Sequence, residues 1–524
     1  MHPLAQTFRA CALAALLAAA GCASAPPRAP QPGAIAAPAS PAALAARIDA
    51  YLAQPRFAAA AWGIHVVSLD SGRTLYAHDA DKLAVPASNA KLYTAALALD
   101  ALGPEHRITT SLYATRAPGP HGVLRGDLLL VGRGDPGFGA VDGPTADWAE
   151  RFASAVAARG IVRVRGDLVA DATFYQGPEF GSGWEARDLQ SGFAAPVSAL
   201  GVADNTVQVA VSRDGARCCT VAVAPAAAGV AVVNLTSAAS TAALGLYRAP
   251  GTSTLYALGS LPAGIDARSY TLAAPDPAML AGNLLGEALA RRGVRIDGKL
   301  RTLRWPQADP ALASPELQTI AELASAPLGE LLRRTLKDSD NVYAQHLLLQ
   351  VGVQAAQRGV CADRARPPDT SEGWGLCALR ALLARIGIAP GAAMFEEGSG
   401  LSRKDLVTPR ATTTLLAWVR TQPFAQAYLD ALPVAGVDGT LDHRFAGTPA
   451  DGHLRAKTGT LTHSYALSGY VTDAAGEHLA FSLMLDRYLR PTDTQGEPVA
   501  PAPSTDLDAI AALLASYAGA PARP

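Results

Sequence analysis

The helix that begins at Ser88 is the feature that most constrains how this chain can fold. Gly103-Pro104 ends this predicted helix, and its apolar residues recur at the i, i+3, i+4 and i+7 spacing of one buried face: Leu92, Ala95, Ala96 and Leu99. Lys91 lies three positions after Ser88, so the two side chains share a face, about 5–6 Å apart at Cβ, and the amine can reach the hydroxyl. A serine needs such a neighbouring proton acceptor to act as a nucleophile. The simpler alternative is a Ser88 that caps the helix beside a solvated Lys91.

The predicted secondary structure changes twice along the chain. A helix over 42–52 and a hairpin of strands over 60–68 and 74–78 are predicted before the Ser88 helix. Short strands between Gly and Pro turns dominate from 104 to 308, and helices return after 311. The chain is expected to close with three alternating strands and a terminal helix, over 452–461, 464–473, 478–485 and 506–517. This order predicts an α/β (α+β) fold with an antiparallel meander and helices at both ends.

Length and charge limit the classes of function. At 524 residues the chain is long for one domain and indicates two to four. Its formal net charge is −1 and it has no basic block, so nothing indicates a nucleic-acid partner. The ten histidines are scattered, and no Cys-x-x-Cys or His-Glu-x-x-His occurs. We therefore expect no metal site and no cofactor.

The N-terminus is typical of an export signal. A short apolar stretch, too short to span a bilayer, leads into Ala19-Ala20-Gly21-Cys22, which resembles a bacterial lipobox. We expect 1–22 to be a signal peptide, Cys22 to carry the lipid, and the Pro/Ala-rich 23–41 to be a tether. Ala23 beside the cysteine suggests outer-membrane sorting, so we expect an exported, periplasmic protein that meets the membrane only through the lipid. Cleavage after Ala25, which gives a plain exported protein, is the alternative.

Six cysteines fit an oxidising compartment. Cys11 falls in the expected signal and Cys22 is the lipid candidate, which leaves four cysteines and three possible connectivities: Cys218, Cys219, Cys361 and Cys377. Cys361 and Cys377 bracket a polar segment and are candidates for a clamped loop. A bridge between the neighbours Cys218 and Cys219 is strained.

Two later segments supply further reactive groups. Ser339-Asp340-Asn341 lies between two predicted helices, and Lys457-Thr458-Gly459-Thr460 lies on a predicted strand. An acyl-serine enzyme needs a nucleophile, a proton shuttle, an amide that holds the substrate backbone, and a cation with hydroxyls for a carboxylate. Each segment alone has a simpler explanation, in which Ser339 caps a helix, Asn341 is a turn residue and Lys457 lies at an exposed strand end. All three motifs in this order are hard to explain by chance.

With these motifs the sequence resembles the class C low-molecular-mass penicillin-binding proteins, which are D-alanyl-D-alanine carboxypeptidases and DD-endopeptidases. The likeness runs from about Ala42 to Tyr517, and about 250 residues separate Ser88 from Ser339, far more than in a β-lactamase. Family segments beyond the three motifs are Gly126-Asp127-Leu128 with Gly134-Asp135-Pro136, Ala195 to Leu200, Gly398 to Ser402, and Leu432 to Leu441.

The resemblance implies a penicillin-binding/β-lactamase-like transpeptidase domain, with an antiparallel sheet flanked by helices and a helical subdomain, that carries two β-rich inserted domains. The discontinuous catalytic domain is expected at 42–103 and 309–518. Inserted domain II is expected at 104–204 and 274–308, and inserted domain III at 205–273.

The resemblance also implies the chemistry at Ser88. Its hydroxyl attacks the carbonyl between two D-alanines, or between D-alanine and the cross-linking residue, and Lys91 takes the proton. Burial and the charge of Lys457 are expected to lower the pKa of Lys91. The backbone N–H groups of Ser88 and Thr460 are expected to form the oxyanion hole.

The remaining motif residues are expected to handle the substrate. By the same resemblance Ser339 relays the proton to the leaving amine, and Asn341 orients Lys91 and holds a substrate amide. The terminal carboxylate is expected to bind Lys457, Thr458, Gly459 and Thr460. The implied partners are peptidoglycan stem peptides and β-lactam antibiotics, which imitate the D-Ala-D-Ala end.

Two positions depart from the family pattern. Glu397 stands where family members usually have Asp, which keeps the charge but moves it by one methylene. After Gly183-Trp184 the family often has two acidic residues that line the cleft, whereas this chain has Arg187-Asp188. We expect Trp184, Arg187 and Asp188 to contact substrate, and a stem peptide that is amidated or bears a carboxylate follows as a hypothesis because Arg187 would repel an amino group.

Two other functions remain open. A serine β-lactamase or esterase on the same fold would need fast deacylation. A non-catalytic peptidoglycan-binding lipoprotein would keep the fold without the reaction.

Overall fold

The computed structural model describes residues 37–214, 217–362 and 365–519. The expected signal peptide, the expected lipid site at Cys22 and residues 23–36 of the expected tether lie outside these ranges. Residues before the expected boundary at 42 already contact the fold, since the Pro38 carbonyl accepts the N–H of Ala518 and the Ser40 hydroxyl caps the first helix. Within the described residues, no helix is long and apolar enough to cross a membrane.

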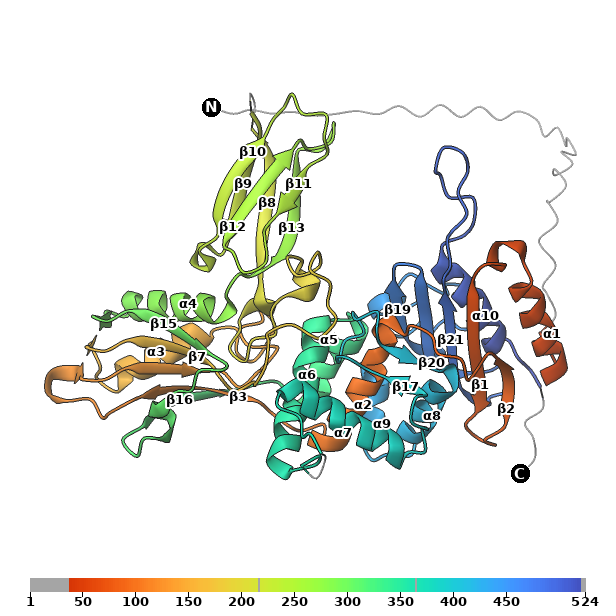
Figure 1. Ribbon diagram of the computed structural model, residues 1–524, viewed down its shortest axis with the longest axis horizontal. Coiled ribbons are helices and arrows are strands. Elements are labelled where there is room, and N and C mark those ends of the chain that lie inside the picture. The colour runs from red at the N-terminus through yellow and green to blue at the C-terminus, as the bar shows by residue number, and fades with distance from the viewer. Residues whose placement is uncertain (1–36, 215–216, 363–364, 520–524) are drawn as a thin grey trace, which may run out of the picture. The chain divides into compact units, whose positions relative to one another are not determined.

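A five-stranded antiparallel sheet unites the two ends of the chain (Figure 1). The strand order is β19-β20-β21-β1-β2, so the N-terminal hairpin pairs with the last of the C-terminal strands. The predicted meander is therefore confirmed. The strands are β1 (Ala61–Ser68), β2 (Thr74–His78), β19 (Leu454–Leu461), β20 (Ser464–Thr472) and β21 (His478–Asp486).

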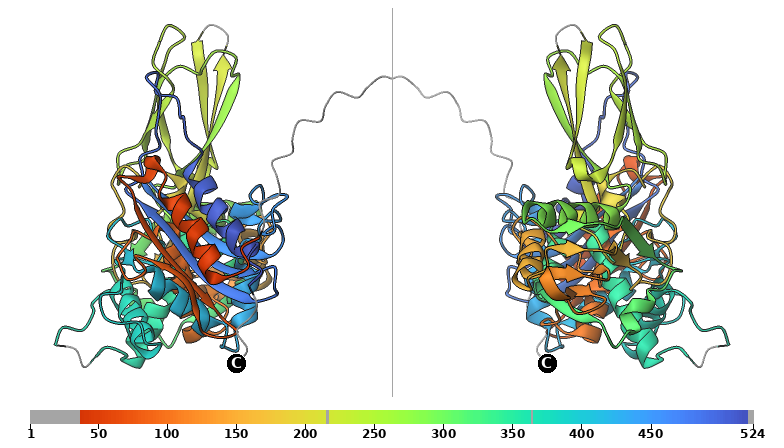
Figure 2. Two further views of the ribbon diagram at one scale, coloured as in Figure 1. Left: turned by 90° about the vertical axis from the view of Figure 1, so that its right-hand side faces the viewer. Right: turned by 90° about the vertical axis from the view of Figure 1, so that its left-hand side faces the viewer.

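Helices cover both faces of this sheet, because successive strand residues point to opposite faces. On β21, Phe481 and Leu483 join the core beneath α1 (Pro41–Leu52) and α10 (Pro503–Ala515), whereas Met484 joins the core that includes α8 (Pro409–Val419). The left view of Figure 2 shows α1 and α10 side by side across the sheet.

The Ser88 helix lies in the interior, where η2 (Ala87–Asn89) leads into α2 (Ala90–Leu102). Every residue from 90 to 99 is buried, so the expectation of a single buried face is wrong. The reason is that α2 packs between the sheet and a group of helices, and small alanine side chains let them approach on all sides. The surrounding helices are α5 (Leu328–Lys337), α6 (Asn341–Arg358), α7 (Ser371–Arg385) and α9 (Ala425–Ala431).

The first insert is built on a mixed sheet with the order β15-β7-β5-β3-β16, and α3 and α4 pack beside one another against it. A small parallel sheet, β14-β6-β4, extends it. Strand β16 pairs with β3, so the sheet continues past the expected boundary at 308. The elements are β3 (Thr109–Ala114), β4 (Val123–Leu124), β5 (Leu128–Val131), α3 (Trp148–Ala158), β6 (Arg163–Val164), β7 (Leu168–Ala172), α4 (Pro277–Arg291), β14 (Arg295–Ile296), β15 (Leu300–Arg304) and β16 (Gln318–Ala324).

The second insert consists of two three-stranded sheets, β13-β8-β9 and β10-β12-β11. Alternate residues of β8, including Val207, Val209 and Val211, are buried, as a half-covered strand requires. The strands are β8 (Thr206–Asp214), β9 (Arg217–Ala224), β10 (Ala231–Thr236), β11 (Gly245–Tyr247), β12 (Thr254–Gly259) and β13 (Ala267–Ala273).

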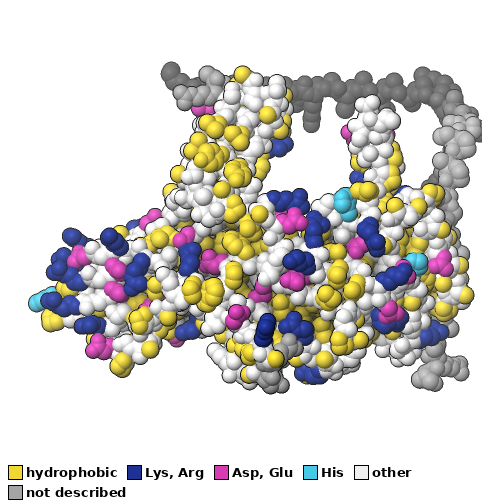
Figure 3. Space-filling model, in the orientation of Figure 1, with side chains coloured by type: hydrophobic (Ala, Val, Ile, Leu, Met, Phe, Trp, Pro, Cys, Tyr) yellow, Lys and Arg dark blue, Asp and Glu magenta, His cyan; other side chains and the backbone are white. Residues whose placement is uncertain are grey.

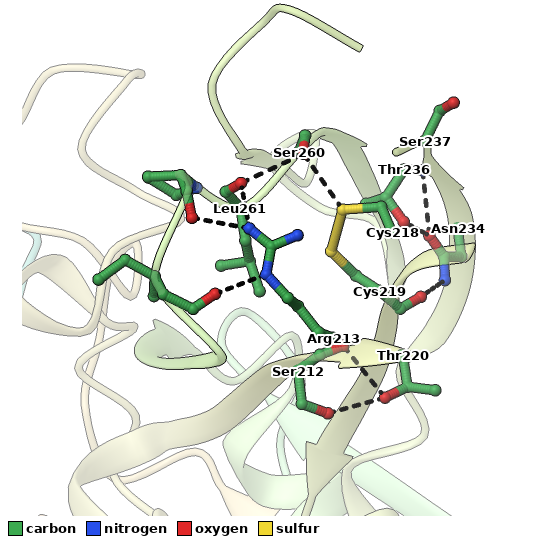
Figure 4. Close-up of a disulfide and its surroundings, with 12 residues drawn as sticks. Ser212, Arg213, Cys218, Cys219, Thr220, Asn234, Thr236, Ser237, Ser260 and Leu261 are labelled. Atoms are coloured by element: carbon green, nitrogen blue, oxygen red, sulfur yellow. Dashed lines mark hydrogen bonds between the residues drawn. A yellow bond between two sulfur atoms is a disulfide. The ribbon is translucent and has the colours of Figure 1, made fainter. Parts of the chain in front are cut away.

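The four remaining cysteines form two disulfides, which correspond to one of the three possible connectivities. Cys361 is bonded to Cys377 on α7, as the bracketed loop indicated. Cys218 is bonded to its neighbour Cys219 on β9, where both side chains are buried beside Ser260 and Asn234 (Figure 4).

Some elements were absent from the sequence-based prediction. These are the strands β11, β12 and β16, the short pair β17 (Ala393–Met394) and β18 (Leu406–Val407), and the helix α9. Each is short, and β16 gains its strand conformation from a partner about 200 residues earlier in the chain. Local periodicity carries no information on such a partner.

Candidate active site

Ser88 lies in the 3-10 turn η2, immediately before α2. Its side chain does not cap the helix, because neither η2 nor α2 has a side-chain cap bond. Ala87 has a left-handed backbone, with φ +47°, and its carbonyl faces the loop at Gly400. A Cβ at Gly400 would lie only 1.9 Å from the Ala87 oxygen, so only glycine lets this loop pack against the Ser88 turn. The alternative of Ser88 as a simple helix cap is thus not supported.

Lys91 connects three parts of the chain. Its Nζ lies 3.0 Å from Ser88 Oγ, and it donates to Asn341 Oδ1 at 2.5 Å and to the Ser399 carbonyl at 2.7 Å. The side chain is fully buried. Asn341 and the Ser399 carbonyl therefore hold the amine beside the Ser88 hydroxyl. In its neutral form, the amine can take the serine proton.

The turn between α5 and α6 presents Ser339 and Asn341 to this amine. Ser339 has a left-handed backbone, with φ +62°, and Asp340 rather than Ser339 caps α6 by accepting the N–H of Tyr343 at 3.0 Å. Asn341 is the first residue of α6, and its Nδ2 donates to the Phe193 carbonyl at 3.0 Å. That bond fixes the amide orientation, so Oδ1 points to Lys91.

Strand β19 brings the second lysine. Lys457 is fully buried, and its Nζ donates to Ser339 Oγ at 2.9 Å and to the Thr458 carbonyl at 3.0 Å. The Thr458 hydroxyl bonds the Thr440 hydroxyl at 2.9 Å. A Cβ at Gly459 would lie 2.6 Å from the Pro86 carbonyl, so glycine lets this edge strand approach the Ser88 turn.

Burial sets the charge states of both amines. Desolvation lowers the pKa of Lys91 to about 8, although Glu397, Asp340 and Asp405 act in the opposite direction. Desolvation, followed by repulsion from Lys91 and Arg444, lowers the pKa of Lys457 well below its usual value. The pKa of Lys91 is lowered by burial, as expected. The expected contribution of the Lys457 charge is not found at Lys91; instead, repulsion from Lys91 lowers the pKa of Lys457.

Ser88 lines a cavity of about 500 Å³. Thr460 and Asn341 line it, as do Arg187 and Asp188 from the first insert. The Arg187 guanidinium lies 2.8 Å from Glu185 and 3.8 Å from Asp188. The first insert therefore forms part of the wall beside the nucleophile.

Trp184 lies elsewhere than expected. Only 8% of its surface is exposed, it packs in the core of the first insert, and it is not part of the cavity wall. Its ring stacks against the backbone at Gly181, where a Cβ would lie 2.5 Å from the indole nitrogen. A Gly-Trp pair in the sequence does not indicate whether the tryptophan lines a cleft or packs in the core, so the position of Trp184 could not be predicted from it.

Several groups at the site had no predicted role. The carbonyls of Ser399 and Phe193 bind Lys91 and Asn341, and a backbone carbonyl carries no signal in the sequence. Arg403 and Tyr465 also line the cavity. Arg403 directly follows the family segment that ends at Ser402, which was the one available indication. No cluster of three or more His, Cys, Asp or Glu that could hold a metal occurs in the part of the chain that the structure describes.

The sequence and the fold are similar to those of known proteins. Residues 44–503 match the D-Ala-D-Ala carboxypeptidase 3 (S13) family. The chain belongs to this family. It is 36% identical over 495 residues to the D-alanyl-D-alanine carboxypeptidase of Actinomadura sp. strain R39, covering 90% of this chain and 84% of that protein.

Other members and structures agree with the assignment to the S13 family. The D-alanyl-D-alanine carboxypeptidase of Haemophilus influenzae is 24% identical over 443 residues, covering 81% of this chain and 85% of that protein. The crystal structure of penicillin binding protein 4 from Haemophilus influenzae superposes with a TM-score of 0.74 at 24% identity, covering 86% of this chain and 95% of that chain. The predicted fold class, an α/β (α+β) penicillin-binding/β-lactamase-like fold, is confirmed.

Proposed function

We propose that this S13-family chain is a serine D-Ala-D-Ala carboxypeptidase and DD-endopeptidase that acts on peptidoglycan stem peptides through an acyl-enzyme on Ser88. The observation that carries the proposal is the position of Lys91 Nζ, 3.0 Å from Ser88 Oγ and bonded to Asn341 and to the Ser399 carbonyl. The family and the name of the Actinomadura relative support the substrate class.

The acylation step follows from these contacts. Neutral Lys91 takes the Ser88 proton as Oγ attacks the carbonyl that precedes the leaving residue. The N–H groups of Ser88 and Thr460 stabilise the oxyanion, which is consistent with the tight approach of β19 to the Ser88 turn at Gly459. Loss of such a donor typically costs about 10²–10³ in rate.

Proton transfer and substrate binding involve the two other motifs. Ser339 Oγ, which Lys457 holds at 2.9 Å, passes the proton to the leaving amine. Asn341 Nδ2 keeps a second hydrogen beyond the one given to Phe193, and this hydrogen binds a substrate amide carbonyl. Lys457, Thr458 and Thr460, on β19, bind the terminal carboxylate. Water then hydrolyses the ester.

β-Lactams acylate the same serine in this proposal, because their ring imitates the D-Ala-D-Ala end. Penicillin binding protein 4 of Haemophilus influenzae has also been crystallised in complex with a novel β-lactam, and that second structure superposes with a TM-score of 0.69. Arg187 in the cavity wall favours a stem peptide whose third residue is amidated or carries a carboxylate.

We also propose that the protein is exported, periplasmic and lipid-anchored at Cys22. This rests on the sequence of the first 22 residues alone. Metabolic labelling with a radioactive fatty acid tests it: wild type should incorporate label and Cys22→Ala should not. Label in both proteins would contradict the anchor site.

Ser88→Ala tests the central proposal. We expect it to abolish both D-alanine release from muropeptides, measured by mass spectrometry, and covalent labelling by a fluorescent penicillin. Labelling that survives would refute the role of Ser88. Comparing turnover of nitrocefin with turnover of a D-Ala-D-Ala peptide distinguishes a peptidase from a β-lactamase, and failure of wild type to label would indicate a non-catalytic protein.

A further inference from the structure

The small sheet β14-β6-β4 of the first insert has an arginine-covered outer face. Its strands are in parallel register, with Arg163 opposite Val123 and Arg295. The second residue of each two-residue strand is apolar: Leu124 and Val164 are buried, and Ile296 is partly buried. Because strand residues alternate between faces, the residues on either side of them share the outer face.

Three guanidinium groups gather on that face around one carboxylate. Arg163, Arg295 and Arg165 lie 2.8, 3.0 and 3.5 Å from the carboxylate oxygens of Asp297. Arg125 follows β4 beside Arg165 and is exposed. Asp127 and Asp167, two residues beyond Arg125 and Arg165, both pair with Arg301 at 3.5 and 3.0 Å. Asp297 alone therefore faces Arg163, Arg165 and Arg295, and the face carries a net positive charge.

The cationic surface continues beyond the sheet. Arg291 and Arg292, at the end of α4, share the single carboxylate of Glu150 at 2.8 and 3.3 Å. Lys299 is exposed just before β15. Figure 3 shows Lys and Arg side chains gathered over the first insert, with Asp and Glu side chains among them. The arginines remain accessible, since 73% of the Arg295 side chain and 55% of the Arg165 side chain are exposed.

We infer that this arginine face binds a linear polymer that carries closely spaced phosphate groups. Guanidinium forms paired hydrogen bonds with phosphate oxygens, and a second anion can replace the shared Asp297 carboxylate as a partner. Neighbouring strands lie about 4.8 Å apart and same-face residues about 6.7 Å apart, so the cations form a narrow row that suits a chain of anions. Three strands of two residues present too small an area for a flat lipid surface.

The arginine face is separate from the reaction. None of β4, β6 and β14 contributes a residue to the cavity beside Ser88. Binding of a polymer there holds the enzyme on a phosphate-bearing layer and leaves the nucleophile free. The inference therefore stands or falls independently of the proposed peptidase activity.

Binding of long-chain inorganic polyphosphate to the full chain tests the inference. The variant Arg163→Gln/Arg165→Gln/Arg295→Gln should bind at least about tenfold more weakly at low salt, and its affinity should depend less on salt concentration, because fewer counterions are released. The control Arg268→Gln/Arg366→Gln/Arg420→Gln removes the same charge from exposed residues outside this face and should bind like wild type. Fluorescent-penicillin labelling of all three proteins checks that they are folded.

Two further ligands test whether binding depends on phosphate groups in a linear polymer. Polyglutamate of matched charge tests carboxylate against phosphate, and vesicles containing phosphatidylglycerol test a membrane. We expect polyphosphate to bind more tightly than either. Absence of polyphosphate binding, equal binding by the arginine-face variant, or tighter binding to polyglutamate or to vesicles would each overturn the inference.

Discussion

Glu397 accepts the backbone N–H of Ser399 at 2.6 Å, and the carbonyl of the same Ser399 accepts a hydrogen bond from Lys91 at 2.7 Å. The Glu397 carboxylate is fully buried and also accepts the N–H groups of Gly400 and Ser402. It therefore shapes the loop that orients the amine, and its charge raises the pKa of Lys91. Burial, followed by repulsion from Glu397, raises the pKa of the Asp405 carboxyl well above the usual value, so that this carboxyl keeps its proton and can donate a hydrogen bond to Glu397.

Glu397→Gln should slow fluorescent-penicillin labelling by on the order of tenfold or more, because an amide nitrogen replaces one acceptor of a charge-assisted bond. Removal of the carboxylate also lets the pKa of Lys91 fall, so the midpoint of the pH–rate profile should move below about 8. Glu397→Asp keeps the charge and should keep the midpoint near wild type. An unchanged midpoint in Glu397→Gln would show that this carboxylate does not act on the amine.

The acylation rate of the wild type should rise with pH and level off above about 8. Lys91 works as a base only when neutral, and burial lowers its pKa to about 8, so the neutral fraction grows as pH rises toward that value. Below it, the rate should change by about tenfold per pH unit. Stopped-flow labelling between pH 6 and pH 9.5 measures this, and a flat profile would exclude Lys91 as the titrating base.

Lys91→Arg should be nearly as damaging as Lys91→Ala, with a loss of about 10²–10⁴ in acylation rate. A guanidinium keeps its proton throughout this pH range, so it can fill the site and bond Asn341 but cannot accept the serine proton. Penicillin labelling measures the rate, and thermal unfolding checks that both variants are folded. A Lys91→Arg protein within tenfold of wild type would contradict the role of the amine.

Gly400→Ala should disrupt the Ser88 turn. Its backbone is left-handed, with φ +80°, and the new Cβ would lie 1.9 Å from the Ala87 oxygen. Gly391→Ala is the matched control, because Gly391 has φ +86° and its Cβ would contact nothing within 4 Å. Both variants bear the backbone cost of about 1–2 kcal/mol. We expect only Gly400→Ala to lose penicillin labelling, by at least about tenfold; equal labelling of the two would show that the close approach to Ala87 is not needed.

Arg187→Asp should change substrate preference rather than the chemical step. Arg187 lines the cavity, so replacing it with a carboxylate should favour stem peptides with a free amino group at the third residue, by on the order of tenfold in kcat/KM relative to amidated ones. Arg187→Gln, which removes the charge without reversing it, should lie between wild type and Arg187→Asp. Competition between the two peptides measures the ranking, and an unchanged ranking would remove Arg187 from substrate recognition.

The sequence by itself determined the local elements and the chemistry. Gly103-Pro104 ends α2, and the positions of β19, β20 and β21 follow from three strand-forming segments separated by turns. The three motifs name the lysines, serines and asparagine that the structure brings within 3.0 Å of a partner. These features depend on neighbours a few positions apart, which a sequence contains directly.

Only the tertiary structure decided the features that join distant segments. Burial on all sides of α2 lowers the pKa of Lys91, and the carbonyls of Ser399 and Phe193 fix the catalytic amine and amide without any side-chain signal. The arginine face likewise needs three strands from separate parts of a chain that has no basic block. Burial, backbone contacts and summed charge depend on which surfaces meet, and that is settled by packing between residues far apart in the chain.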